Sequence, residues 1–209
     1  MTTCGDSSMA EQLDIFQQAD CGSTPTSPLH IQKIGHVHAQ RFVEKWHYSN
    51  RMPTGKNIPY GLMIDNELYA VIVYGLGVNP YQSGFLNCKQ AIEIKRMCRS
   101  EPKKDYQLSR LISITTKWAR KEMWFDMVVA FADPEHGHEG TVYKASGFEH
   151  MGYTNPEIHV VDESGETRHR RYAFRYARRN NVSIEEARNQ LGLTRIKTAP
   201  KHRYCRRLI

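Results

Sequence analysis

One stretch, Val128 to Tyr153, constrains the fold more than the rest of the chain does. It opens within the apolar run 127–131, which is typical of a buried strand. Asp133 and the proline after it end this strand, because proline has no N–H to donate and disfavours helix in the residue before it. A polar loop, a short helix pattern over 141–146 and a second strand follow. The sequence therefore predicts a strand–loop–helix–strand unit of an α/β fold.

Reactive side chains gather where the first of these strands ends. Sites in open α/β sheets form at the carboxyl ends of strands, so we expect Asp133, His136, His138 and Tyr143 around one mouth. Asp133 is a candidate base beside an amine or a candidate metal ligand, and its structural alternative is a turn cap. Tyr143 has the alternative of a packed core residue.

Strand and helix patterns alternate along the rest of the chain. Apolar alternation predicts strands at 29–34, 60–64, 68–74, 92–97, 157–161, 170–177 and 202–208. Helical spacing predicts helices at 38–46, 108–124 and 183–191. We expect the long helix to pack Leu111, Ile114 and Trp118 against the sheet, with its N-terminus open to the mouth. Residues 1–28 read as a disordered leader and 29–209 as one domain.

Charge is distributed unevenly along the 209 residues. The net charge is +7, yet residues 166–209 alone hold thirteen Lys or Arg against three acids, a basic C-terminal extension. Such an excess indicates a polyanionic partner, and a solvated basic face is the alternative. The candidate phosphate contacts are Arg168, Arg170, Arg171, Arg203, Arg206 and Arg207.

Five irregularly spaced cysteines without a C-x-x-C pair argue against a disulfide or zinc framework. They favour a reducing cytoplasm. The sequence contains no apolar run of membrane length.

Two family resemblances meet in the central stretch. The segment Tyr143 to Gly152, with Gly147-Phe148 inside it, resembles the late helix–strand segment of GNAT acyltransferases. The longer phrase FADPEHGHEGTVYKASGF resembles the Mom family of phage proteins, which are GNAT-like and hypermodify adenine in phage DNA. Further islands of this resemblance are His47-Tyr48-Ser49, Tyr60-Gly61, Tyr74-Gly75, Glu93 with Arg96, Ser109-Arg110 and the segment Pro200 to Tyr204.

The resemblance implies a GNAT-like α/β fold, with a central mixed, twisted sheet flanked by helices. It implies conversion of adenine to N6-carbamoylmethyladenine in double-stranded DNA inside the infected bacterial cell, which protects phage DNA from host restriction. An ordinary GNAT acetyltransferase acting on a protein or small amine is the alternative. A DNA-binding module without catalysis is a third class, and the reactive side chains at the mouth speak against it.

The same resemblance assigns site residues. Asp133, Tyr143, His47, Tyr48, Tyr60 and Arg96 would be catalytic. A tyrosine at the place of Tyr143 protonates the departing thiolate in GNAT enzymes. Ser109 and Arg110 would hold the phosphates of an acyl-CoA, or part of another acyl or glycyl donor, at the N-terminus of the long helix. The glycines usual in that loop are missing here, which counts against ordinary CoA binding.

Two further expectations concern a bound metal ion and the position of the adenine base. His136 and His138 with Asp133, joined by His47, resemble a set of two histidines and a carboxylate suited to iron or zinc. Adenine N6 lies within a paired stack, so the enzyme must extrude the base or act on a single strand. Tyr48, Tyr60 and Tyr74 are candidates to stack on it.

Overall fold

The computed structural model describes residues 29–77, 86–100 and 106–208. The expected leader (1–28) and most of the loop before the long helix (101–105) lie outside the described residues. The elements of the first half are β1 (Leu29–Lys33), α2 (His36–Trp46), β2 (Asn57–Ile64), β3 (Glu67–Leu76), β4 (Ala91–Arg99) and α4 (Tyr106–Met123). Those of the second half are β5 (Met127–Ala132), the 3-10 turn η1 (Pro134–His136), α5 (Thr141–Ala145), β6 (Glu149–Tyr153), β7 (Ile158–Val161), β8 (Thr167–His169), α6 (Arg171–Asn180), α7 (Ile184–Gln190), β9 (Thr194–Lys197) and β10 (His202–Arg207).

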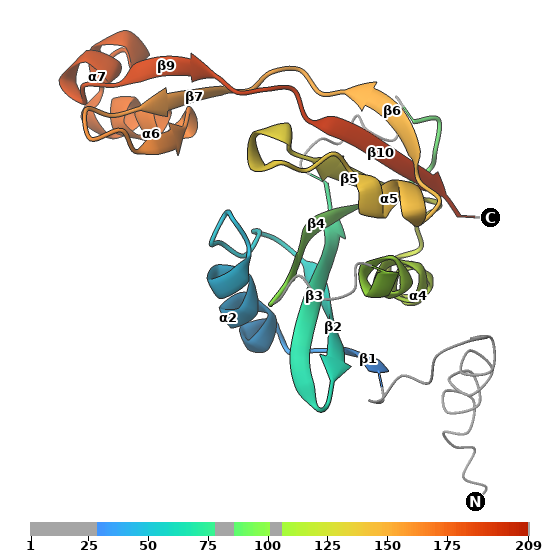
Figure 1. Cartoon of the computed structure of the whole chain (residues 1–209). Helices are drawn as coiled ribbons and strands as arrows, with labels where there is room; N and C mark the ends of the chain where they lie inside the picture. Colours follow the sequence, from blue (N-terminus) through green and yellow to red (C-terminus); the bar gives the residue numbers. More distant parts are fainter. Residues whose placement is uncertain (1–28, 78–85, 101–105, 209) are drawn as a thin grey trace, which may run out of the picture.

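Seven strands form the main sheet, in the order β1-β2-β3-β4-β5-β10-β6 (Figure 1). Neighbouring strands are antiparallel except β4 and β5, which run parallel. Helices α2 and α4 cover opposite faces of the sheet. The predicted mixed sheet flanked by helices is therefore confirmed.

Alternation along β3 creates a core on each face of the sheet. Val71 and Val73 pack with the apolar side of α2, whereas Ile72 and Tyr74 face α4. Leu111 of α4 is fully buried against this second face, and Ile114 and Trp118 pack beside it, as predicted. The N-terminal half of the sheet is thus a rigid support for the start of α4.

The hairpin between β2 and β3 turns at Asp65 and Asn66. Both residues have positive φ, 53° and 63°. This is the left-handed backbone of the type I′ turn, which aspartate and asparagine tolerate.

The prediction of a strand over 170–177 is wrong, because most of this segment is the helix α6. The alternation of Tyr172, Phe174 and Tyr176 suggested a strand. The residues buried are Ala173 and Ala177, four positions apart on one helix face. The hairpin partner of β7 is instead the short β8, and β9 adds a third strand that sequence periodicity did not reveal.

The basic C-terminal extension divides into two parts. Residues 158–197 form a separate lobe, in which the sheet β8-β7-β9 packs with α6 and α7 (Figure 1). The chain then returns to the main sheet, where β10 pairs with β5 on one side and β6 on the other. At the base of the lobe the entering and leaving chains meet: the N–H of Thr198 donates to the Glu157 carbonyl at 2.9 Å.

Among the helices of the described ranges, none combines the length and the apolar character needed to cross a bilayer.

Candidate active site

The site lies where the two parallel strands part. β4 and β5 pair only from Ala91 with Met127 to Ile94 with Ala130. An irregularity in the pairing of β3 with β4 follows directly, because Tyr74 pairs with Ile94 and Val73 with Arg96, leaving Lys95 as an extra residue. Bulges of this kind bend a strand and redirect its side chains. Beyond Ile94 the strands therefore diverge, and their ends line an opening.

A cavity of about 430 Å³ occupies this opening. The end of β4, the start of α4, the end of β5, the following loop and α5 all contribute to its wall. The predicted residues among its lining are His47, Tyr48, Arg96, Ser109, Asp133, His138 and Tyr143. Residues more than ninety positions apart in the sequence are thus brought to one place, which supports the expectation of a single mouth.

Asp133 fixes the loop after β5. It is 6% exposed, and its Oδ1 accepts a hydrogen bond from the N–H of Glu135 at 3.2 Å, which caps η1. Its backbone carbonyl accepts from the N–H groups of both His136 and His138. The other carboxylate oxygen, Oδ2, lies 3.2 Å from Nζ of Lys201, just before β10. The structural alternative, a turn cap, is therefore realised, together with an ion pair that joins the loop to the last strand.

The ion pair also affects the ionisation of Lys201. Burial lowers the pKa of its ammonium, but the charge and hydrogen bond of Asp133, together with Tyr48 and Glu157, raise the pKa above its ordinary value. Lys201 therefore keeps its charge at neutral pH. Sequence reasoning did not select Lys201 as a site residue, and the signal available was a lysine just before the last strand in the segment that resembles the Mom family.

Tyr204 of β10 holds the glycine-containing part of the loop. Its hydroxyl donates to the carbonyl of Glu139 at 2.7 Å, and its ring is fully buried. Gly140 lies against this ring, with φ +73°, and a Cβ added there would come within 2.1 Å of Tyr204 Cε2. A glycine is therefore required at 140 both by the backbone and by the ring.

His47 and Tyr48 reach the cavity from the turn after α2. The Ser49 N–H donates to His47 Nδ1 at 3.1 Å, so Nδ1 is an acceptor and the neutral ring carries its proton on Nε2. Burial, reinforced by the charge of Arg96 and by His138 and His136, lowers the pKa of His47 to about 4. The ring is consequently uncharged at neutral pH.

Tyr48 forms an aromatic stack at the cavity. Its ring lies 4.3 Å from that of His47 and 3.9 Å from that of His136, with interplanar angles of 32° and 25°. Tyr48 is nonetheless 46% exposed, so part of the side chain remains open to solvent.

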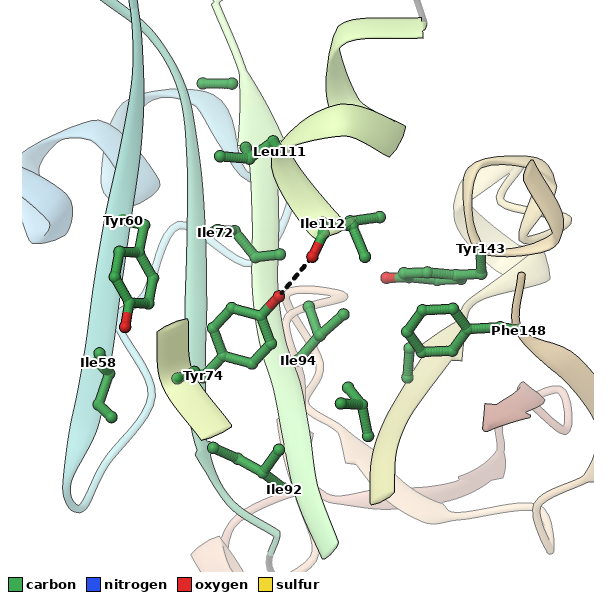
Figure 2. Close-up of a cluster of buried hydrophobic side chains, with 14 of the residues drawn as sticks. Ile58, Tyr60, Ile72, Tyr74, Ile92, Ile94, Leu111, Ile112, Tyr143 and Phe148 are labelled. Carbon is green, nitrogen blue, oxygen red and sulfur yellow. Dashed lines mark hydrogen bonds between the residues drawn. The ribbon is translucent and has the colours of Figure 1, made fainter. Parts of the chain in front are cut away.

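Tyr143 is the most buried phenol of the cavity wall. It is 8% exposed, and its ring packs on Phe148 and Tyr204, each with a centroid 5.7 Å away. Figure 2 shows its hydroxyl pointing toward α4 near Ile112. No hydrogen bond of this hydroxyl is formed within the described part of the chain. Burial, helped by Tyr48, Tyr74 and Glu93, strongly raises the pKa of Tyr143, so the phenol stays protonated.

Arg96 and Ser109 supply the polar wall opposite the loop. Nε of Arg96 donates to the Arg51 carbonyl at 3.1 Å, which fixes the guanidinium. Burial lowers the pKa of Arg96, but a guanidinium remains charged at neutral pH. Ser109 of the first turns of α4 lines the cavity, whereas Arg110 is not among the lining residues.

Tyr60 and Tyr74 are core residues, which corrects the expectation that they stack on a base. Tyr60 is 1% exposed and donates to Glu122 at 3.1 Å. Tyr74 is fully buried, and its hydroxyl lies within hydrogen-bonding distance of Thr115 and Thr116. Figure 2 shows the same hydroxyl donating to the Ile112 carbonyl. Alternation along the strands placed both on the inward side of the sheet, so periodicity indicated packing rather than a site.

The residues proposed as metal ligands do not form a ligand set. Across 29–77, 86–100 and 106–208 no group of three or more His, Cys, Asp or Glu is arranged to hold a metal ion. The individual contacts explain this. Asp133 is engaged by Lys201, and His136 is stacked on Tyr48. The site therefore fits iron or zinc poorly.

The arginines of the extension differ in their surroundings. Arg168 forms ion pairs with Asp162 and Glu166 and lies over the Tyr172 ring. Arg206 donates to the Ser146 carbonyl at 2.8 Å, and Arg207 donates to the Asn87 carbonyl at 3.1 Å. The side chains of these three arginines are thus engaged by the protein itself. Arg203 is half-buried in β10, while Arg170 and Arg171 are exposed on the lobe.

Comparison with known proteins gives three findings. The model of the Mom protein family matches residues 28–208. The methylcarbamoylase mom of Escherichia phage Mu is 26% identical over 139 residues, which are 64% of this chain and 58% of that protein. The chain thus matches little more than half the length of this relative.

Solved structures with the same fold include an N-acetyltransferase from Staphylococcus aureus Mu50, with a TM-score of 0.50 and 14% identity over 86% of this chain and 97% of that one. A putative acetyltransferase from Acinetobacter baylyi has a TM-score of 0.51 and 11% identity, over 89% and 95%. At these identities the likeness establishes the fold alone.

Proposed function

Because the chain belongs to the Mom protein family, we propose that it is a transferase that modifies adenine in phage DNA inside the infected bacterial cell. The product would be N6-carbamoylmethyladenine, which protects the DNA from host restriction. The observation that carries the proposal is the cavity between β4 and β5, which is lined by an acceptor, a proton donor, an aromatic ring and a fixed cation.

The half-exposed ring of Tyr48 is the proposed contact for the adenine, with the base taking the place of His136 on one ring face. The contact with His47 would keep the ring in position. Modification of N6 requires that the base leave the duplex, and flipped bases are held by stacking and by hydrogen bonds to their edges. The Asp133 carboxylate beside this ring would accept a hydrogen bond from the N6 amino group.

The group donor would lie along the start of α4 and the guanidinium of Arg96. A helix N-terminus favours negative charge, and Ser109 lies there on the cavity wall. Both features suit an anionic donor, which we propose is an acyl-CoA or another acyl or glycyl carrier. Arg110 would support it from outside the cavity.

Tyr143 is the proposed acid. Its pKa is raised, so the phenol holds its proton at neutral pH, and the hydroxyl has no hydrogen bond of its own within the described chain. The proton is therefore present at neutral pH, and the hydroxyl would donate it to a leaving group as negative charge develops there. Neutral His47, with its proton on Nε2, would donate a hydrogen bond without adding charge.

The experiment that tests this function is nucleoside mass analysis of DNA from cells that express the chain. We expect a new adenine-derived nucleoside of the mass of carbamoylmethyl adenine deoxynucleoside. Unmodified adenine together with an acetylated protein or small amine would instead identify an ordinary N-acetyltransferase. A Tyr143→Phe variant is analysed in the same way, and loss of the product in this variant would show that the product is formed in this cavity.

A further inference from the structure

The lobe carries a row of arginines that the site does not use. On α6, Arg171, Phe174, Arg175 and Arg178 follow the spacing i, i+3, i+4 and i+7, so they share one helix face. All four are exposed, whereas Ala173 and Ala177 face the lobe interior. The helix therefore buries two small residues and presents three long cations and an aromatic ring to solvent.

These cations are not used by the protein itself. Within the described residues, the side chains of Arg171, Arg175 and Arg178 make no ion pair and no hydrogen bond. Arg168, three residues before the helix, shows the contrast, since two carboxylates and the Tyr172 ring hold it. Like charges at these spacings repel one another, so the row costs stability unless an anion covers it.

The exposed ring of Phe174 distinguishes this helix face from a charged face that is only solvated. It lies between the arginines and is 50% exposed, although burial of its ring would be favourable. A ring among cations suits a partner that offers phosphates beside apolar sugar and base surface, because an aromatic side chain contacts the latter while arginines bind the former.

The lobe is fixed next to the cavity. Four residues, 198–201, connect β9 to β10, and two of them bind the loop after β5. The N–H of Ala199 donates to Glu135 at 2.6 Å, and Lys201 pairs with Asp133. Strand β9, which leads from the lobe to this connection, adds the exposed Arg195 and Lys197. A polymer held on the lobe would therefore be kept close to the loop that lines the cavity.

From these observations we infer that the Arg171–Phe174–Arg175–Arg178 face of α6 binds the phosphate backbone of duplex DNA beside the base that enters the cavity. This inference rests on the proposed function. From Arg171 to Arg178 the helix rises about 10 Å, which matches about three phosphates along one strand of B-DNA. Each arginine would neutralise one phosphate, and Phe174 would contact the sugar or base between them.

The test compares a triple variant, Arg171→Gln with Arg175→Gln and Arg178→Gln, with a control that loses the same charge elsewhere. The control is Arg41→Gln with Lys89→Gln and Lys121→Gln, three exposed cations of the main domain. Binding of a labelled duplex is measured over a series of salt concentrations. We expect the triple variant to bind more weakly and its log–log salt slope to fall by about 2.7, since each lost contact removes about 0.9. Phe174→Ala should weaken binding and leave the slope unchanged.

No variant should unfold at a lower temperature than the wild type, because the buried Ala173 and Ala177 are untouched. The triple variant should unfold at the same or a slightly higher temperature, because it loses charges that repel one another. An unchanged slope in the triple variant, an equal loss in the control, or tighter binding to a single strand than to the duplex would overturn the inference. If one of these results is obtained and the wild-type protein still modifies adenine, the inference about α6 is wrong and the proposed function is unaffected. A wild-type protein that neither modifies adenine nor binds duplex removes both.

Discussion

At the scale of single residues, Tyr143 and Tyr204 form a natural pair for experiment. Their rings are in contact, yet the Tyr204 hydroxyl is bonded to the loop carbonyl of Glu139 while that of Tyr143 is bonded to no described residue. The same deletion of one oxygen should therefore have opposite consequences at the two positions.

We predict that Tyr143→Phe lowers adenine modification by about 10²–10⁴-fold, the usual cost of removing a positioned acid, with an unchanged melting temperature. Tyr204→Phe should instead lower stability by about 1 kcal/mol, the cost of one lost hydrogen bond, and retain most activity. Modified nucleoside and thermal unfolding are measured on the same samples. Full activity of Tyr143→Phe would exclude this phenol as the acid.

Asp133 needs a conservative substitution, because it has structural partners. Asp133→Asn keeps an oxygen to cap η1 and removes the charge that faces Lys201. We predict a large loss of modification with a modest loss of stability, from nucleoside analysis and thermal unfolding. Asp133→Ala would lose the cap as well and should unfold at a lower temperature than Asp133→Asn. Equal activity of Asp133→Asn and wild type would contradict a role of the carboxylate at N6.

His47 predicts how stability depends on pH. Its pKa is about 4 in the folded chain against an ordinary 6.5, so the unfolded chain binds the proton more tightly. Folding stability is then full above pH 6.5 and is lost as pH falls toward 4, by at most about 3 kcal/mol. We expect the melting temperature of His47→Gln to fall less than that of wild type between pH 7 and pH 5. His36→Gln, at an exposed position at the start of α2, serves as control and should follow the wild type.

At the scale of elements, the loop from β5 to α5 depends on two glycines in different ways. Both have positive φ, +71° at Gly137 and +73° at Gly140, but a Cβ at Gly137 meets no atom within 4 Å. We predict that Gly137→Ala costs about 1–2 kcal/mol from backbone conformation alone. Gly140→Ala should cost clearly more and impair modification, because it also displaces the Tyr204 ring. Chemical denaturation measures both, and equal costs would show that the ring yields freely.

Sequence periodicity was sufficient to predict a strand or helix where one face of the element is buried and the other is exposed. The strands of the main sheet and α4 follow from such patterns. It failed for α6, because the helix buries only Ala173 and Ala177 and its tyrosines alternate as in a strand. At the site, the position of Asp133 after a strand predicted its place on the cavity.

The contact of Asp133 with Lys201 was out of reach of sequence reasoning, since it depends on how β10 returns to the sheet. Tyr60 and Tyr74 were misassigned for a related reason: a family resemblance marks a residue without saying whether it lies at the surface or in the core.

At the scale of the whole molecule, we expect that the lobe can be removed from the main domain without unfolding it, whereas β10 cannot. The chain enters and leaves the lobe side by side at Glu157 and Thr198, whereas β10 lies between two other strands. We predict that replacing 158–197 by a short Gly-Ser linker leaves a cooperatively folding domain that has lost most of its affinity for DNA.

A chain that stops at residue 197 should fail to fold, because it leaves β5 without its neighbour on that side. Circular dichroism and thermal unfolding of the two shortened proteins show whether each of them folds. A folded chain without β10, or an unfolded chain without the lobe, would contradict this division.

The place of β10 also determines when the protein can become active during its synthesis. Ala132 pairs with His202, and Lys201 and Tyr204 complete the loop that carries Asp133. A growing chain can form the hairpin of β2 and β3 early, since those contacts are local, but it must wait for residues 201–207 before this loop is held in place. We therefore expect a chain that has not yet reached residues 201–207 to lack the ordered loop that carries Asp133.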